Sequence, residues 1–211
     1  MPCVTDFNDY IASQSLLKHP FYQMWNKGEL TLEDLQVYVK EYYHLARHIP
    51  NMCSSIRDNA QTKRPDMVDA ITHNMDEETE HADLWLTFGT SLGLSKDEIT
   101  AYEPSETMKT AVSDLCTLCD KSFEEGVAAM YALECELPEV AETKKTGLKK
   151  FYNLESHDAH VYFDEHLNEA KHLQVWIKTD VNEKTEQAIH DSMNAQNRVL
   201  DAVCEVAGIT C

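Results

Sequence analysis

Several predicted helices carry ionisable side chains in the middle of their apolar faces. The helix predicted over residues 66–93 places Glu77 and His81 on one such face, because residues four apart lie about one turn from each other. Glu78 lies at the edge of the same apolar arc. Burying an unpaired charge costs on the order of several kcal/mol, so a partner or a metal ion must compensate for it.

Two further predicted helices offer groups of the same kind. Glu134 lies at the centre of the apolar face of one of them. In the helix predicted over residues 156–178, His166, Glu169 and His172 span about a third of the circumference. Carboxylate and imidazole ligands suit iron, manganese and zinc, and helix bundles build two-metal sites from inward glutamates and histidines. These residues therefore predict a metal site that three helices share.

The elements that position these groups are predicted to be helices throughout. Thr31 and Asp34 have the spacing of a capping box and open a helix that runs towards Pro50. The last predicted helix covers about residues 182–207 and is followed by a glycine. No alternating strand pattern, internal repeat or linker occurs, and glycine and proline are few. We therefore predict one all-α domain over residues 1–211.

The composition restricts the partners. The net charge is −19, with 37 acidic against 18 basic residues. Such a surface repels nucleic acid and anionic membranes, so we exclude both. No stretch approaches the roughly 18 consecutive apolar residues of a membrane span. The sequence begins without the basic and apolar pattern of a signal peptide, so we expect a cytoplasmic protein with reduced cysteines.

Other polar residues have less specific patterns. Lys144 lies on an apolar stripe of its predicted helix, which leaves two interpretations open: a side chain that reaches past the helix flank to water, or a buried, reactive amine. His157 and His160 face away from the apolar side of their helix and are predicted at the surface. Cys116 and Cys119 form a C-x-x-C motif without a second pair, which makes a zinc or redox role a minor alternative.

Eight short motifs in order along the chain give a specific resemblance. They are HPFYQMWNKGELT (19–31), YYH (42–44), MDEE (75–78), HADLW (81–85), EPSE (103–106), GVAAMY (126–131), ECELP (134–138) and YFDEH (162–166). Together they resemble the chlamydial death-domain-associating protein family, which belongs to the haem-oxygenase-like dimetal oxidases. The resemblance covers about residues 15–175.

This resemblance implies a haem-oxygenase-like seven-helix bundle that binds two metal ions, Fe/Fe or Mn/Fe, and no haem. It also implies an oxygenase that uses O₂ and an external reductant to make 4-aminobenzoate for folate biosynthesis. Tyr22 matches the tyrosine that the family is thought to consume, and Lys144 matches the proposed amine donor. The implied metal ligands are Glu77, His81, Glu134, His166, Glu169 and His172. A homodimer is compatible with the sequence, which does not identify the electron donor.

The chain departs from the family pattern at two places. Glu77 and His81 are only one turn apart, where the family has additional residues, so Glu78 competes with Glu77 as the first ligand. The last motif is one residue shorter than the family's and has glutamate, Glu169, in place of aspartate. Glu165 is the alternative ligand on that helix in place of Glu169 or His166.

The same residues allow four other interpretations. The protein could be a conventional dimetal oxidase of a small metabolite, a metal-free thiaminase-type enzyme with Cys135 as nucleophile, or a partner-binding module. It could also be a ferritin-like diiron protein in which His166, Tyr22 and Lys144 are structural. The ligands of that ferritin-like site would be Glu41, Glu78, His81, Glu134, Glu169 and His172.

Overall fold

The computed structural model describes residues 3–167, 170–177 and 181–211, and these residues form helices and no strand. The prediction of an all-α protein is confirmed. The described α-helices are more numerous than the seven that the resemblance implies, because several of them are short. They are α1 Asn8–Ser13, α2 Pro20–Lys27, α3 Leu32–Ala46, α4 Ile49–Lys63, α5 Val68–Ser91, α6 Lys96–Thr100, α7 Glu106–Lys121, α8 Phe123–Glu134, α9 Leu137–Phe151, α10 His157–His166, α11 Ala170–Trp176 and α12 Glu183–Ala207.

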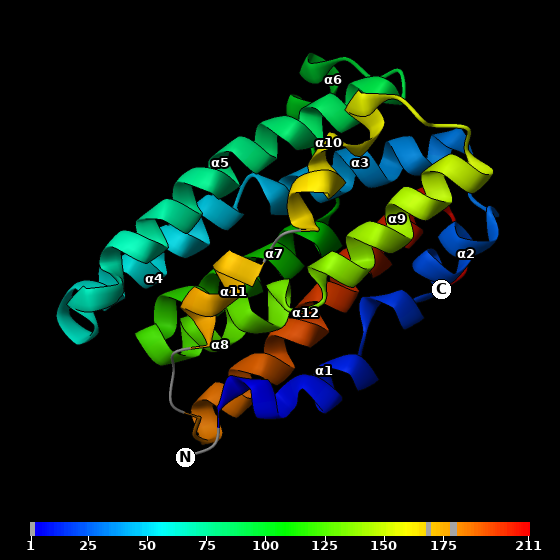
Figure 1. Ribbon diagram of the computed structural model, residues 1–211. Helices are drawn as coiled ribbons and strands as arrows, with labels where there is room; N and C mark the ends of the chain where they lie inside the picture. The colour runs from blue at the N-terminus through cyan, green and yellow to red at the C-terminus, as the bar shows by residue number, and fades with distance from the viewer. Residues whose placement is uncertain (1–2, 168–169, 178–180) are drawn as a thin grey trace.

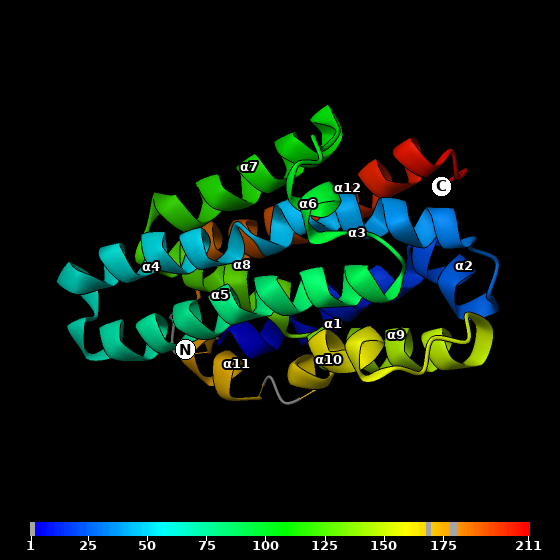
Figure 2. The same ribbon diagram turned by 90° about the horizontal axis from the view of Figure 1, so that it is seen from above.

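The long helices form layers around α8, which is buried along almost its whole length. Figure 2 shows α7 on one side of the molecule, α9, α10 and α11 on the opposite side, and α3, α4, α5 and α8 between them. In the view of Figure 1, α10 and α11 lie between α5 and the pair α9 and α12. Trp25, Trp85 and Trp176 are each fully buried in the core. None of the described helices is long and apolar enough to cross a membrane.

The caps that the sequence predicts are present. The side chain of Thr31 accepts a hydrogen bond from the backbone N–H of Asp34, whose carboxylate accepts one from the backbone N–H of Thr31. Gly208 has a φ of +69°, a left-handed conformation that ends α12. These caps satisfy backbone groups that the helix ends would otherwise leave without partners.

Two predicted helices are divided differently in the structure. The helix that was expected to end near Pro50 ends at Ala46, and Pro50 lies in the first turn of the next helix, α4, which was not predicted. The helix predicted over 156–178 is two helices, α10 and α11. The two pack on different partners: α10 lies against α5 and α9, whereas α11 lies mainly against α8.

Two predictions are wrong, one about the exposure of a histidine and one about the oxidation state of two cysteines. His160 is buried, because its Nε2 lies 2.8 Å from the carbonyl oxygen of Leu154 in the turn before α10 and donates to it. Cys204 and Cys211, which were expected as reduced thiols, form a disulfide in the structure, whereas the other described cysteines are free.

Candidate metal centre

Helix α5 supplies a buried carboxylate and an imidazole that point in the same direction. Glu78 is 3% exposed, and its Oε1 lies 3.3 Å from Nδ1 of His81, one turn further along. Burial alone would raise the pKa of Glu78, but hydrogen bonds from His172 and His81 bring that pKa down to about 2. Glu78 is therefore a carboxylate at neutral pH, held inside the protein by imidazoles.

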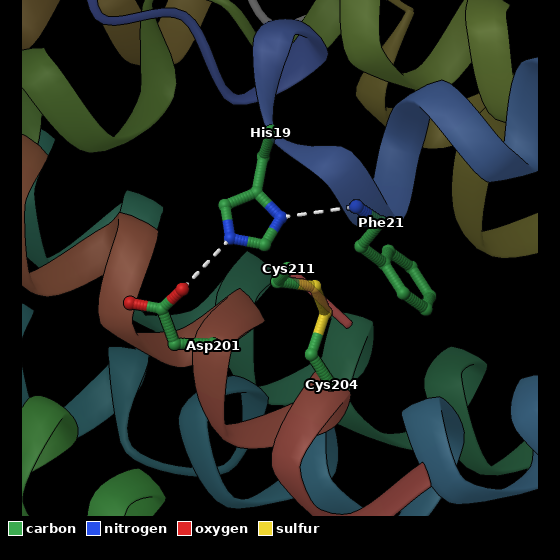
Figure 3. The surroundings of a disulfide bond; sticks show 5 residues. All are labelled: His19, Phe21, Asp201, Cys204 and Cys211. Atoms are coloured by element: carbon green, nitrogen blue, oxygen red, sulfur yellow. Dashed lines mark hydrogen bonds and ion pairs between the residues drawn. A yellow bond between two sulfur atoms is a disulfide. The ribbon is translucent and has the colours of Figure 1, made fainter. Parts of the chain in front are cut away.

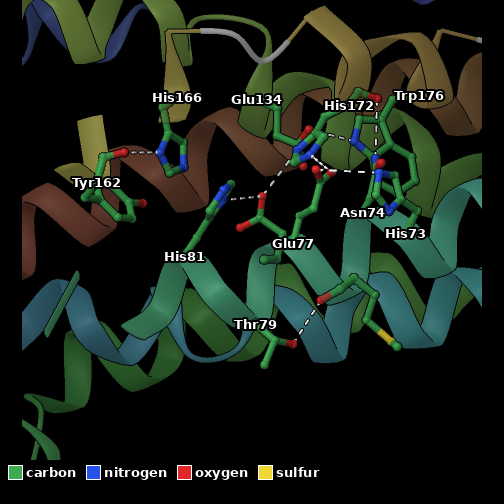
Figure 4. Close-up of polar contacts among 12 residues, drawn as sticks. His73, Asn74, Glu77, Thr79, His81, Glu134, Tyr162, His166, His172 and Trp176 are labelled. Carbon is green, nitrogen blue, oxygen red and sulfur yellow. Dashed lines mark hydrogen bonds and ion pairs between the residues drawn. The ribbon is translucent and has the colours of Figure 1, made fainter. Parts of the chain in front are cut away.

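His166 enters the same space from the end of α10. Its Nδ1–H donates to the carbonyl oxygen of Tyr162 at 2.7 Å, which leaves the lone pair of the neutral ring on Nε2. A backbone partner of this kind is what orients a metal-binding histidine. The rings of His81 and His166 lie beside each other at an interplanar angle of 47°, with their centroids 4.6 Å apart (Figure 4). One ligand atom each from Glu78, His81 and His166 lies within 4.8 Å of the others.

A second group borders this cluster on the side of α11. Nε2 of His172 donates to Oε2 of Glu77 at 2.6 Å, and its Nδ1 lies 3.5 Å from Oε1 of Glu78. The side chain of Glu77 is 38% exposed, against 3% for Glu78. Figure 4 shows Glu77 and His172 beside His81. The structure therefore brings Glu78 into the buried cluster and leaves Glu77 at its solvent side.

Glu134 reaches the same region from the last turn of α8. It is 2% exposed, and its Oε2 accepts a hydrogen bond of 2.7 Å from the indole N–H of Trp176. The charge of Glu134 also acts to raise the pKa of the neighbouring thiol of Cys53, whose pKa is raised most by burial. A buried carboxylate with an indole donor fits the chemistry of a ligand that a second group orients.

The remaining predicted ligands have different positions. Glu169 lies outside the described residues. Glu165, the alternative on that helix, is exposed to solvent. Glu41 is buried, but its carboxylate accepts hydrogen bonds from the hydroxyl of Tyr102 at 2.6 Å and from the backbone N–H of Ser105 at 3.0 Å. It therefore holds α3 to the start of α7, which removes a ligand from the ferritin-like interpretation.

Next to the cluster, α9 buries an amine among aromatic rings. Lys144 is 3% exposed, and burial lowers its pKa to about 7. Its Nζ donates a 2.6 Å hydrogen bond to the hydroxyl of Tyr38, which lies 3.2 Å from the hydroxyl of Tyr22. The amine is 5.3 Å from the centre of the Tyr22 ring. Of the two interpretations of Lys144, the structure shows the buried one.

Helices α2 and α9 are held together beside these two residues. The indole N–H of Trp25 donates to the backbone carbonyl of Lys144 at 3.3 Å. A Cβ atom at Gly147 would lie 2.4 Å from the indole nitrogen, so this approach requires a glycine. Tyr22 precedes Trp25 by almost one turn of α2, so the contact also positions Tyr22 against Lys144. No sequence pattern marks Trp25, Tyr38 or Gly147 as site residues, because only the pairing of the helices brings them together.

Two small cavities adjoin the candidate centre. One, of about 20 Å³, touches Glu78, Glu134 and His166 and is otherwise lined mainly by apolar side chains. The other, of about 10 Å³, lies between His166 and Lys144. Each is about large enough for one water-sized molecule. The imidazole cluster and the buried amine are thus neighbours with only small cavities beside them.

The thiaminase-type interpretation needs a reactive thiol, which the structure does not support. Burial, together with the charge of Glu136, raises the pKa of Cys135 to about 12. The thiolate is the nucleophilic form of cysteine, and it is scarce at neutral pH when the pKa is raised in this way.

These features define a helical protein with a buried carboxylate–histidine cluster suited to metal ions, and comparisons with known proteins place it in a family. Residues 10–206 match the TENA/THI-4/PQQC family, and the chain belongs to this family. It is 35% identical over 212 residues to the 4-aminobenzoate synthase of Chlamydia muridarum, covering 95% of this chain and 89% of that one.

Solved structures support the same fold. A domain of unknown function with a haem-oxygenase-like fold from Shewanella denitrificans matches with a TM-score of 0.79 and 17% identity, over 96% of this chain and 92% of that one. A CADD-like protein of unknown function from Nostoc punctiforme matches with a TM-score of 0.73 and 15% identity, over 97% of this chain and 92% of that one. The predicted haem-oxygenase-like fold and the resemblance to the chlamydial family are confirmed.

Proposed function

We propose that the protein is an O₂-dependent dimetal oxygenase that makes 4-aminobenzoate from its own Tyr22, with Lys144 as the amine donor. The name of the Chlamydia muridarum relative supports the product. The observation that carries the proposal is the placement of the Lys144 amine 5.3 Å from the centre of the Tyr22 ring, inside the protein.

The substitution pattern of the product matches the tyrosine side chain. In 4-aminobenzoate a carboxyl group and an amino group lie opposite each other on a benzene ring. In Tyr22 the Cβ and the hydroxyl lie opposite each other in the same way. Oxidation of Cβ to the carboxyl carbon with cleavage of the Cα–Cβ bond, and replacement of the hydroxyl oxygen by the Lys144 nitrogen, would therefore yield the product without rearranging the ring. In the second exchange the hydroxyl oxygen would leave as water and the Cε–Nζ bond of Lys144 would break, which leaves Cε as an aldehyde. O₂ is the oxidant that takes up the electrons.

Side chains around Tyr22 and Lys144 set the orientation and the protonation states that this reaction needs. Because the pKa of Lys144 is about 7, a large fraction of the amine is neutral at neutral pH and has a lone pair for attack. The hydroxyl of Tyr38 lies between the amine and the hydroxyl of Tyr22 and orients both. Burial raises the pKa of Tyr22 well above its ordinary value, so the phenol keeps its proton until oxidation.

We infer that the candidate centre holds two metal ions. Glu78, His81 and His166 would hold one ion, and Glu134 and His172 would contribute to the second. This set takes Glu78 in place of Glu77, because Glu78 is the buried member of the pair. When bound, Fe/Fe or Mn/Fe would supply the binding and reduction of O₂ with electrons from an external donor. Glu169 remains a proposed ligand outside the described residues.

The size of the interior favours a reactant that is part of the chain. Sites for small molecules usually have volumes of roughly 300–1,000 Å³. The cavities beside the candidate centre hold about 20 Å³ and about 10 Å³. A conventional dimetal oxidase that acts on a free metabolite would need more room than this. We retain the cytoplasmic location, the homodimer and the external electron donor as predictions.

Isotope labelling tests the proposal. Protein with ring-labelled tyrosine, purified, reduced and exposed to Fe(II) and air, should release labelled 4-aminobenzoate, and the spent chain should lose mass at Tyr22. Tyr22→Phe should form no product while it still binds metal. Lys144→Arg should bind metal and lose most activity, because arginine cannot act as the amine donor. If Tyr22→Phe makes product at the normal rate from an added small molecule, the conventional oxidase replaces our proposal.

A further inference from the structure

A second group of metal-ligating side chains lies where the end of α12 meets the start of α2, and it shares no residue with the candidate metal centre. Ligand atoms of His19, Cys204 and Cys211 lie within 4.8 Å of one another. Oδ1 of Asp201, one turn before Cys204, is 3.0 Å from Nε2 of His19. Figure 3 shows these side chains gathered around the imidazole ring.

The two sulfur atoms can change state. In the structure they form a disulfide, in which Cys204 is buried and Cys211 is exposed. A disulfide with an exposed sulfur can be reduced by thiols. The thiolate of a dithiol reductant would attack Sγ of Cys211 and displace Cys204 as a thiolate. The second thiol of the reductant would then release Cys211, so that two protein thiols form and the reductant becomes a disulfide.

In the reduced state the donor set suits a specific class of ion. Two thiolates, one imidazole and one carboxylate are a ligand set that Zn²⁺ binds in tetrahedral geometry. In the oxidised state Asp201 is hydrogen-bonded to Nε2 of His19 at 3.0 Å, and its half-exposed side chain would turn from that hydrogen bond to the ion as the fourth ligand. Each thiol would release its proton to solvent as the ion binds.

We propose that His19, Asp201, Cys204 and Cys211 form a redox-controlled site for Zn²⁺ or another thiophilic divalent cation. The reduced pair binds the ion, and the disulfide excludes it. This site does not depend on the function proposed above.

Binding of a metal ion at this site would affect the start of α2, the helix that carries Tyr22. Nδ1 of His19 accepts the backbone N–H of Phe21 at 3.2 Å and so caps α2. Nε2 therefore carries the ring proton and donates it to Asp201. An ion at Nε2 replaces this proton, and the neutral ring then carries its proton on Nδ1. The N–H of Phe21 loses its acceptor, so metal binding loosens the first turn of α2.

Cobalt(II) is the probe for this site, because thiolate bound to Co²⁺ absorbs in the near ultraviolet. The proposed ligands of the candidate metal centre are carboxylates and imidazoles and give no such band. The reduced full chain should develop the band with about one equivalent of Co²⁺ per chain. Oxidation by hydrogen peroxide should abolish the band, because Cys204 and Cys211 then form the disulfide again. The two thiols give up two electrons and two protons, and the peroxide becomes two waters. Hydrogen exchange at Phe21 should rise when Co²⁺ binds.

Variants assign the band to these residues. Cys211→Ser, at an exposed position that does not endanger folding, should lose the band, and Cys204→Ser should do the same. Cys116→Ser/Cys119→Ser is the matched control and should keep it. His19→Asn retains a side-chain cap for α2 but should weaken Co²⁺ binding by at least about 10-fold. Absence of the band in the reduced chain, or its persistence in Cys211→Ser, overturns the proposal. Either result leaves 4-aminobenzoate formation untouched.

Discussion

The buried amine of Lys144 should make the stability of the metal-free protein depend on pH. The pKa of Lys144 is about 7 in the folded chain, against an ordinary value of 10.5. Between these two values the unfolded chain binds a proton that the folded chain does not. The free energy of unfolding must therefore rise as the pH increases through this window. Below pH 7 both states are protonated and the penalty of burying the ammonium group is fully present.

The magnitude follows from the two pKa values. Raising the pH from about 7 to about 9.5 should increase the contribution of Lys144 to the free energy of unfolding by about 3 kcal/mol. Lys144→Met removes the titrating group and keeps a side chain of similar length. The difference in unfolding free energy between wild type and Lys144→Met should change by that amount over the same window.

Urea denaturation of the metal-free chain at the two pH values measures this difference. The contributions of the other titrating groups to the free energy of unfolding are the same in wild type and variant, so they cancel. Lys149→Met, at an exposed position of the same helix, is the control and should follow the wild-type pH dependence. If Lys144→Met shows the same pH dependence as wild type, Lys144 is charged or solvated in the folded protein. The argument for a neutral amine donor would then be wrong.

Three further predictions concern the metal centre and its support. Glu78→Gln should weaken metal binding more than about 100-fold, and Glu77→Gln much less; equal effects in calorimetric titrations would contradict the choice of Glu78. His166→Ala should lose metal by elemental analysis whereas the exposed Glu165→Ala retains it, and the reverse would mean that the register of α10 is misread. Gly147→Ala should lower the stability by about 1–3 kcal/mol and reduce product formation, as followed by thermal unfolding and chromatography; an unchanged yield would exclude a positioning role for this contact.

The sequence predicted the helices and the types of the site residues well, because both follow local rules. Amphipathic periodicity identified α5, α8 and α9 and placed His81, Glu134 and Lys144 on apolar faces. All three are buried in the structure. A polar residue in the middle of an apolar stripe is a strong signal, since a buried charge without compensation would destabilise the fold.

Periodicity alone does not decide which of two neighbouring residues on a helix faces the core. Glu77 and Glu78 are about 100° apart on α5, and a broad apolar arc includes both. Which one faces inward depends on the rotation of α5 about its axis, and the packing of α5 against α4 and α10 sets this rotation. His160 is a similar case, because its burial requires the turn at Leu154 to fold back onto α10.

The candidate site combines two costly features within one interior. A carboxylate–imidazole cluster needs polar ligands in the core, and an amine held among aromatic rings lacks the hydration that it would have in water. Either feature alone could be replaced by apolar side chains that would pack at least as stably. Together they form a chain of contacts from Glu78 and His81, through Tyr162 and the small cavity beside His166, to Lys144 and Tyr22. The amine lies between about 5.2 and 5.3 Å from the ring centres of Tyr22, Tyr38 and Tyr42, and a reaction with the ring of Tyr22 is the role that we propose for it.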